Sequence, residues 1–178
     1  MYQSILQFWF EEITPAQWWK ADSDFDALVA KRFGAIHQQA VCAELFGWRE
    51  EPHGRLAEVI VLDQFSRNIF RNTRRAFEAD PLALALAQES VACGADKALS
   101  ETERVFLYMP YMHSESKLIH TVADRLFLQH TPKSNHEFEL RHKAIIDRFG
   151  RYPHRNAVLG RESTDEEVTF LLEPGSRF

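Results

Sequence analysis

Gly54-Arg-Leu-Ala-Glu-Val-Ile-Val-Leu-Asp-Gln-Phe-Ser-Arg-Asn-Ile-Phe70 is the stretch that decides the fold of this 178-residue chain. Its apolar residues recur at intervals of three and four positions, which is the periodicity of a helix. Residues 59–62 are all apolar, so the middle of this helix is apolar on every side. A helix of that kind is typically buried, and we expect this one to lie deep in the core.

The segments before and after this helix also carry helical signals, and none of them alternates as a strand does. Asp80-Pro81 is a typical helix start, and residues 100–103 and 164–167 have the pattern of a capping box. Gly94 and Gly150 are typical helix stops. We therefore expect helices over about 5–10, 22–45, 54–70, 80–94, 100–108, 113–129, 135–150 and 164–172.

The predicted fold class is all-α, with about eight helices in antiparallel pairs and a single domain over residues 1–178. Pro110 is expected to end the helix over residues 100–108 and to separate it from the next helix. Globin-like packing, a bundle and a short solenoid are all compatible with the pattern.

Composition favours a soluble globular protein of the cytoplasm. The chain is 45% hydrophobic and 26% charged, and its N-terminus lacks the basic region and cleavage site of a signal peptide. The longest apolar run, residues 59–62, is too short to span a bilayer. Cys42 and Cys93 have no CxxC spacing, so we expect small buried hydrophobes in a reducing compartment, with no disulfide. No membrane partner is expected.

Positive charge is concentrated in two places although the chain is acidic. The net charge is −5, yet residues 63–75 carry +3 and residues 141–161 carry +5. An acidic chain is a poor nucleic-acid binder, because phosphate affinity needs a broad basic face. A local basic pocket can still bind a small anion. Structural ion pairs with the acidic remainder of the chain are the alternative.

The first basic segment continues a stripe of the buried helix with polar residues. Gln64, Arg67, Asn68 and Arg71 follow Leu56 and Ile60 at helical spacing. Polar side chains that continue a buried stripe need partners, because an unpaired buried charge is strongly destabilising. They are interpreted either as ligand-binding residues or as a polar network that joins helix ends; simple exposure is the third possibility.

The second basic segment is a rigid turn, Gly150-Arg-Tyr-Pro-His-Arg-Asn156. Gly and Pro preorder its backbone, which favours binding. Arg151, Arg155 and Asn156 are candidate ligand-binding residues for a carboxylate or phosphate, and His154 is a candidate acid or base. A helix C-cap with arginines on nearby carbonyls is the alternative.

A third polar segment, His113-Ser-Glu115, follows Pro110 at an expected helix start. His113 and Glu115 are candidate catalytic residues for proton transfer, although simple capping explains them equally. The spacing of the histidines does not predict a metal site, and the sequence has neither a glycine-rich phosphate loop nor a dinucleotide fingerprint. No cofactor is expected.

These motifs resemble an uncharacterised bacterial family, catalogued as domain of unknown function 924. The resemblance rests on residues 8–10, 62–71, 106–110, 113–115, 148–156, 159–161 and 163–164. It implies an all-α fold similar to tetratricopeptide-like helical arrays, and no reaction. His120 and Tyr152 depart from the Gln and Phe that are usual in the family.

The sequence therefore predicts a polar pocket for a small anionic molecule, with acid–base hydrolase or transferase chemistry as its extension. The rival hypothesis is a helical module that binds an acidic peptide or a partner helix along an open groove. The oligomeric state is not predicted.

Overall fold

The computed structural model describes residues 1–176, and these residues form helices and connecting turns without a strand. The predicted all-α fold is confirmed. When helical segments that follow one another without a break are joined, eight helices of seven or more residues result, close to the predicted number.

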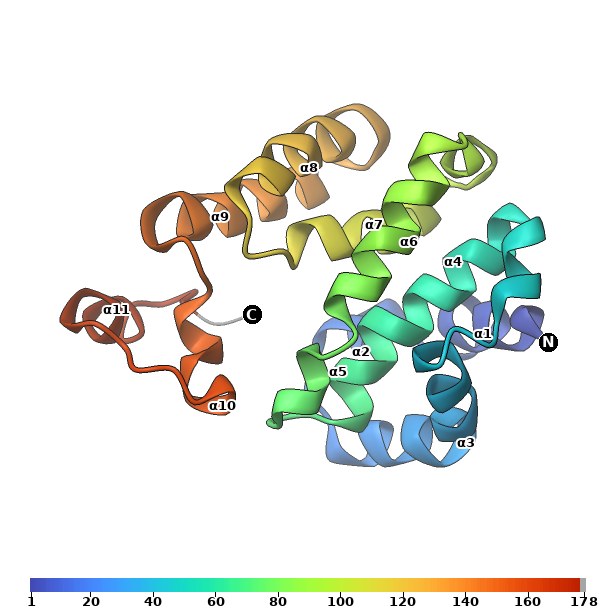
Figure 1. Cartoon of the computed structure of the whole chain (residues 1–178), viewed down its shortest axis with the longest axis horizontal. Helices are drawn as coiled ribbons and strands as arrows, with labels where there is room; N and C mark the ends of the chain where they lie inside the picture. Colours follow the sequence, from blue (N-terminus) through green and yellow to red (C-terminus); the bar gives the residue numbers. More distant parts are fainter. Residues whose placement is uncertain (177–178) are drawn as a thin grey trace.

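The α-helices are shown in Figure 1. They are α1 (Tyr2–Gln7), α2 (Pro15–Trp19), α3 (Ser23–Val41), α4 (Pro52–Ile60), α5 (Ser66–Ile69), α6 (Asp80–Ala92), α7 (Glu101–Met112), α8 (Lys117–His130), α9 (Lys133–Phe149), α10 (Asn156–Leu159) and α11 (Asp165–Phe170).

The helix predicted from residues 54–70 is the centre of the core. It consists of α4, a wider π-helical turn over Val61–Phe65, and α5. Every residue from Leu56 to Phe65 is buried. Helices α1, α3, α6 and α7 pack around it. The helix is therefore apolar on every side because it is buried on every side, as predicted. The π turn was not predicted; it holds the buried Asp63.

Neighbouring helices run antiparallel. Helices α8 and α9 are joined through only two residues and pack side by side, and α4 lies beside α6 (Figure 1). Such short connections force antiparallel pairs. The finer comparison with tetratricopeptide arrays remains a prediction.

Pro110 does not break the chain as predicted. It lies inside α7, two residues before the end of that helix. Proline removes one N–H from the hydrogen-bond ladder, and α7 continues for only two residues after it. The ring of Pro110 is buried. As a result His113 is the C-cap of α7 and not the start of the next helix, which begins at Lys117 behind the cap Ser116.

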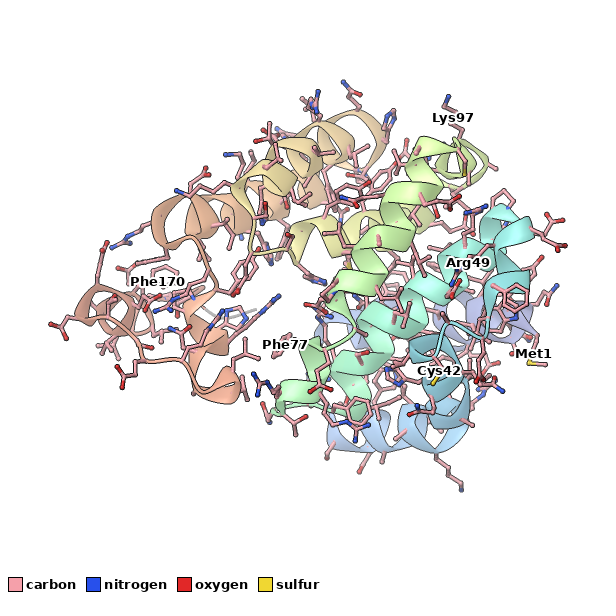
Figure 2. The ribbon with its side chains drawn as sticks, in the orientation of Figure 1. Met1, Cys42, Arg49, Phe77, Lys97 and Phe170 are labelled. Carbon is pink, nitrogen blue, oxygen red and sulfur yellow. The ribbon has the colours of Figure 1, made fainter. Side chains whose placement is uncertain are left out.

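The prediction that both cysteines are buried was wrong. Cys42 follows the end of α3 and Cys93 follows the end of α6, and both are exposed (Cys42 is labelled in Figure 2). The predicted helices extended to residues 45 and 94, whereas α3 ends at Val41 and α6 at Ala92. Both cysteines therefore lie just outside the helices and not on a buried helix face. Both thiols are free.

The end of the chain forms a separate small cluster. Gly150 ends α9 with a φ of 70°, as predicted, and a 3₁₀ turn, Pro153–Arg155, leads into α10. Ile145, Ile146 and Tyr152 form the buried centre of this cluster. In Figure 1 the segment with α10 and α11 lies to one side of the main helices. Its position brings Arg155 opposite the beginning of α6.

None of the helices in the described residues is both long and apolar enough to cross a lipid bilayer.

Candidate functional site

A cavity of about 440 Å³ lies between the beginning of α6, the end of α7 and the segment around α10. This volume is in the range of small-molecule sites. Phe77, labelled in Figure 2, marks the side of the cavity next to α6. The lining consists of Arg74, Phe77, Glu78, Asp80, Pro81, Leu84, Pro110, His113, Ser114, Glu115, Arg155 and Leu159.

His113 contributes an imidazole that is held from behind by a buried carboxylate. Its Nδ1 lies 2.7 Å from Oδ1 of Asp63, and Asp63 is completely buried. Burial opposes ionisation, but Arg67 and His113 outweigh it and hold the pKa of Asp63 below its usual value. An ionised carboxylate only accepts hydrogen bonds. Nδ1 of His113 therefore carries the hydrogen and donates a hydrogen bond to Asp63.

This arrangement leaves His113 neutral, with the lone pair on Nε2. Burial, and then the charge of Arg67, lower the pKa of His113. Among the described residues, its ring makes a hydrogen bond through Nδ1 alone. An imidazole that a carboxylate fixes in one tautomer is suited to accept a proton through its other nitrogen.

Charges alternate from this pair to the opposite wall of the cavity. Arg67 lies 3.0 Å from Asp63 and makes two bonds with Asp80, of 2.9 and 3.1 Å. The second Asp80 oxygen lies 3.4 Å from Nη1 of Arg155. Asp63, Asp80 and Arg155 come from three different parts of the chain, so the series ties α6 and the C-terminal segment to the central helix.

Arg155 is a buried cation with incomplete pairing. Only 6% of the residue is exposed, and its guanidinium lies 4.6 Å from the ring centroids of both Phe77 and Tyr152. Its contact with Asp80 is long, and its Nε has no hydrogen-bond partner. Burial, and then Arg67, lower the pKa of Arg155. A buried donor without a partner is uncommon in folded proteins, and a bound anion would satisfy it.

Arg74 is the other arginine of the lining. It is exposed, and it has no ion pair or hydrogen bond within residues 1–176. It is therefore available at the edge of the cavity.

Glu115 holds the C-terminal segment in place. It makes two bonds with Arg161, of 2.6 and 2.9 Å, and accepts the backbone N–H of Tyr152 at 2.8 Å. Burial opposes ionisation of Glu115, but Arg161 and that N–H lower its pKa. Although Glu115 lines the cavity, it is an ionised, fully engaged carboxylate and not a proton donor.

Three residues of the predicted polar stripe do not line the cavity. Asn68 and Arg71 both bind Asp26 of α3, at 2.9 and 2.8 Å. Gln64 donates to Asp63 at 2.5 Å. Of the stripe, Arg67 alone connects to the cavity, through Asp80.

Arg151 and Asn156 also point elsewhere. Arg151 makes bonds of 2.6 and 2.8 Å with Glu167, and Asn156 donates to the same carboxylate at 3.2 Å. Glu167 is the third residue of α11 and closes the predicted capping box with Thr164. These residues join the C-terminal helices to one another.

His154 is not among the residues that line the cavity. Its ring is 5.5 Å from that of Tyr152. Burial, and then the charge of Arg155, lower its pKa to about 4, so His154 is neutral at neutral pH.

Asp63, Asp80 and Arg74 belong to the site but were not among the predicted site residues. Asp63 precedes the polar stripe and lies four positions before Arg67. That spacing was the one available signal, because residues four apart share a helix face. Asp80 was interpreted only as a helix start.

No group of three or more His, Cys, Asp and Glu side chains in the described part of the chain is arranged to hold a metal ion.

Comparisons with known proteins identify the family and a similar fold, but no activity. A family described as "Bacterial protein of unknown function (DUF924)" matches residues 5–175. The chain belongs to this family. A solved structure, that of a protein of unknown function (ATU0120) from Agrobacterium tumefaciens, has 38% sequence identity to the chain. The match covers 96% of each chain with a TM-score of 0.91. None of the curated proteins matches.

In this DUF924 protein, Arg71 is well paired and is expected to be structural, whereas Arg155 is poorly paired and is a candidate functional residue. We expect Arg71→Ala to lower the free energy of unfolding by about 1 kcal/mol, because a partly exposed ion pair with Asp26 is lost. Arg155→Met should not lower it, because a poorly paired buried cation is replaced by an apolar side chain of similar length and Asp80 keeps Arg67. Urea denaturation measures both. A loss of more than about 1 kcal/mol in Arg155→Met would make Arg155 a structural residue.

The lowered pKa of His154 predicts a pH dependence of stability. The unfolded chain binds this proton near pH 6.5, whereas the folded protein binds it near pH 4. Stability is therefore complete above about pH 6.5 and decreases as the pH falls towards 4, on the order of 1 kcal/mol per pH unit. In His154→Gln this part of the slope should disappear, whereas the control His53→Gln, at a partly exposed histidine, should keep it. Equal slopes in wild type and His154→Gln would contradict the assignment.

Proposed function

We propose that this protein binds a small anionic organic molecule in the cavity next to Arg155 and acts on it by general base catalysis through His113. One observation carries the proposal. A buried arginine with an unsatisfied Nε and an imidazole oriented by a buried carboxylate line the same cavity. Either feature has structural explanations when taken alone. Together they supply a binding group and a reactive group for one ligand.

Hydrolysis of an ester is the reaction that these groups fit best. A water molecule gives one proton to Nε2 of His113, and its oxygen forms a bond to the electrophilic carbon. The bond to the leaving oxygen breaks, and the imidazolium returns the proton to that oxygen. Asp63 stabilises the imidazolium, since their atoms are 2.7 Å apart. Arg155 would balance the negative charge that develops on the substrate.

Fewer residues take part than the sequence predicted. Arg155, His113 and Arg74 contact the ligand in this proposal, and Asp63, Arg67, Asp80 and Glu115 position them. Gln64, Asn68, Arg71, Arg151 and Asn156 support the fold, and His154 packs near the ring of Tyr152 outside the cavity lining.

The acidic-peptide hypothesis has less support. It needs arginines that are exposed along a groove, but Arg71, Arg151 and Arg161 are each engaged by a carboxylate. Its remaining basis is a few exposed arginines without an ion pair in the described residues, among them Arg74, Arg75 and Arg141. Of these, Arg74 alone is in the cavity lining. A cytoplasmic location continues to be our expectation.

Ligand binding is tested first by thermal shift. We expect a saturable rise in Tm with small carboxylates or phosphates, because a ligand that binds only the folded state stabilises it. Arg155→Met should lose the rise while remaining folded, and Arg71→Ala should retain it. If no anion raises the Tm of the wild type, or if Arg155→Met responds as the wild type does, the proposed pocket is wrong.

Catalysis is tested with p-nitrophenyl acetate and p-nitrophenyl phosphate. His113→Gln should reduce the rate on the accepted substrate by about 10²–10⁴-fold and still show the ligand-induced rise in Tm. Because the pKa of His113 is lowered, the wild-type rate should stay constant as the pH falls through 6.5 and decrease only below it. Ser114→Ala should retain the activity, since water is the nucleophile. A rate that is unchanged in His113→Gln would remove His113 from the mechanism.

A further inference from the structure

The chemical class of the ligand can be inferred from the remainder of the cavity lining. This inference rests on the proposed function, and it concerns the same cavity. Five of the twelve lining residues are apolar: Phe77, Pro81, Leu84, Pro110 and Leu159. They come from the turn before α6, from α6, from α7 and from α10, so more than one side of the cavity is apolar.

The apolar lining is only partly covered by the protein itself. Phe77, Leu84 and Leu159 are half-buried, although each is an apolar side chain that gains by leaving water. A bare phosphate or acetate on Arg155 would leave them in that state. A ligand with a hydrocarbon body would cover them, and this is the usual composition of a small-molecule site: mostly apolar walls with a few polar groups that fix the orientation.

The charges around the cavity favour a monoanion over a dianion. The lining contains two arginines, Arg74 and Arg155, but also Glu78, Asp80 and Glu115. Arg67 is paired with Asp80, and Arg161 with Glu115. With Asp63 included, the site holds four carboxylates and four arginines around a neutral His113. A site without excess positive charge gives little compensation for a second negative charge on the ligand, and Asp80 and Glu115 would repel it.

The size of the cavity limits the length of the ligand. A volume of about 440 Å³ equals roughly fifteen water molecules of about 30 Å³ each. A carboxylic acid with a chain of about eight carbons has fewer heavy atoms than these water molecules and fits that volume.

We propose that the ligand is a monocarboxylate with an apolar body, with its carboxylate on Arg155 and its hydrocarbon chain against Phe77, Leu84 and Leu159. The carboxylate completes the hydrogen bonding of Nε of Arg155, and the chain covers the half-buried apolar wall.

The experiment is isothermal titration calorimetry of the full-length protein with acetate, butyrate, hexanoate and octanoate. Each methylene that leaves water raises affinity about fourfold, so octanoate should bind at least tenfold more tightly than butyrate. Octyl phosphate should bind more weakly than octanoate. The neutral octanamide should bind more weakly still, because it leaves Arg155 without a counter-charge.

Two variants identify the two parts of the site. Arg155→Met should abolish the preference for octanoate over octanamide. Leu84→Asn should remove most of the gain with chain length but leave the binding of acetate unchanged. Leu128→Asn is the matched control, because Leu128 is a leucine on α8 that is 62% exposed and lies outside the cavity lining. It should bind every probe as the wild type does.

The outcomes separate this inference from the proposed function. If all the carboxylates and inorganic phosphate bind equally well, the anion pocket stands and the apolar-bodied ligand is wrong. Tighter binding of octyl phosphate than octanoate would also overturn the monocarboxylate. If octanamide binds as well as octanoate, or if no probe binds, both proposals fail.

Discussion

The burial of Asp63 is the constraint on which the rest of the site depends. A carboxylate in the interior is tolerated only if its charge is balanced and its oxygens accept hydrogen bonds. Asp63 meets both conditions through His113 on α7, Arg67 one turn further along its own helix and the neighbouring Gln64. These partners fix how the end of α7 sits against the central helix. Asp63 also determines the tautomer of His113. One buried charge therefore fixes both the packing of α7 on the central helix and the ring nitrogen of His113 that can accept a proton.

Each buried charge next to Asp63 also needs a partner of opposite charge, and the last charge of the series, Arg155, is only partly paired. Arg67 balances Asp63 and is balanced in turn by Asp80, which leaves Asp80 only a 3.4 Å contact for Arg155. Each earlier member of this series has close partners, and the last one does not. An unpaired buried donor at a cavity is expected where binding, and not stability alone, has shaped the structure. It lies at the cavity and nowhere else along the series.

Local features of the fold were predictable, and distant pairings were not. The buried helix, the capping boxes at Ser100 and Thr164 and the stop at Gly150 depend on residues within a few positions of one another. The partners of the arginines depend on tertiary packing: Arg71 and Asp26 are 45 residues apart, and His113 and Asp63 are 50 apart. A single sequence indicates that such charges need partners but does not choose among 26 acidic residues. The stripe of Gln64, Arg67, Asn68 and Arg71 therefore appeared as one surface, whereas the structure divides it between Asp26, Asp63 and Asp80.

The C-terminal segment has a role in the site that follows from how it is attached. Its own apolar centre is small, with Ile145, Ile146 and Tyr152 as the buried residues. Its polar attachments to the main helices include the contacts of Glu115 with Arg161 and with the backbone of Tyr152, and the hydrogen bond from the Tyr152 hydroxyl to the carbonyl of Met112. Polar contacts are directional, so they fix the position of Arg155 relative to His113 more closely than a small apolar patch would. A ligand that contacts both Arg155 and the wall formed by α6 would add apolar contact at this junction, and binding would therefore stabilise the segment that carries its main anchoring residue.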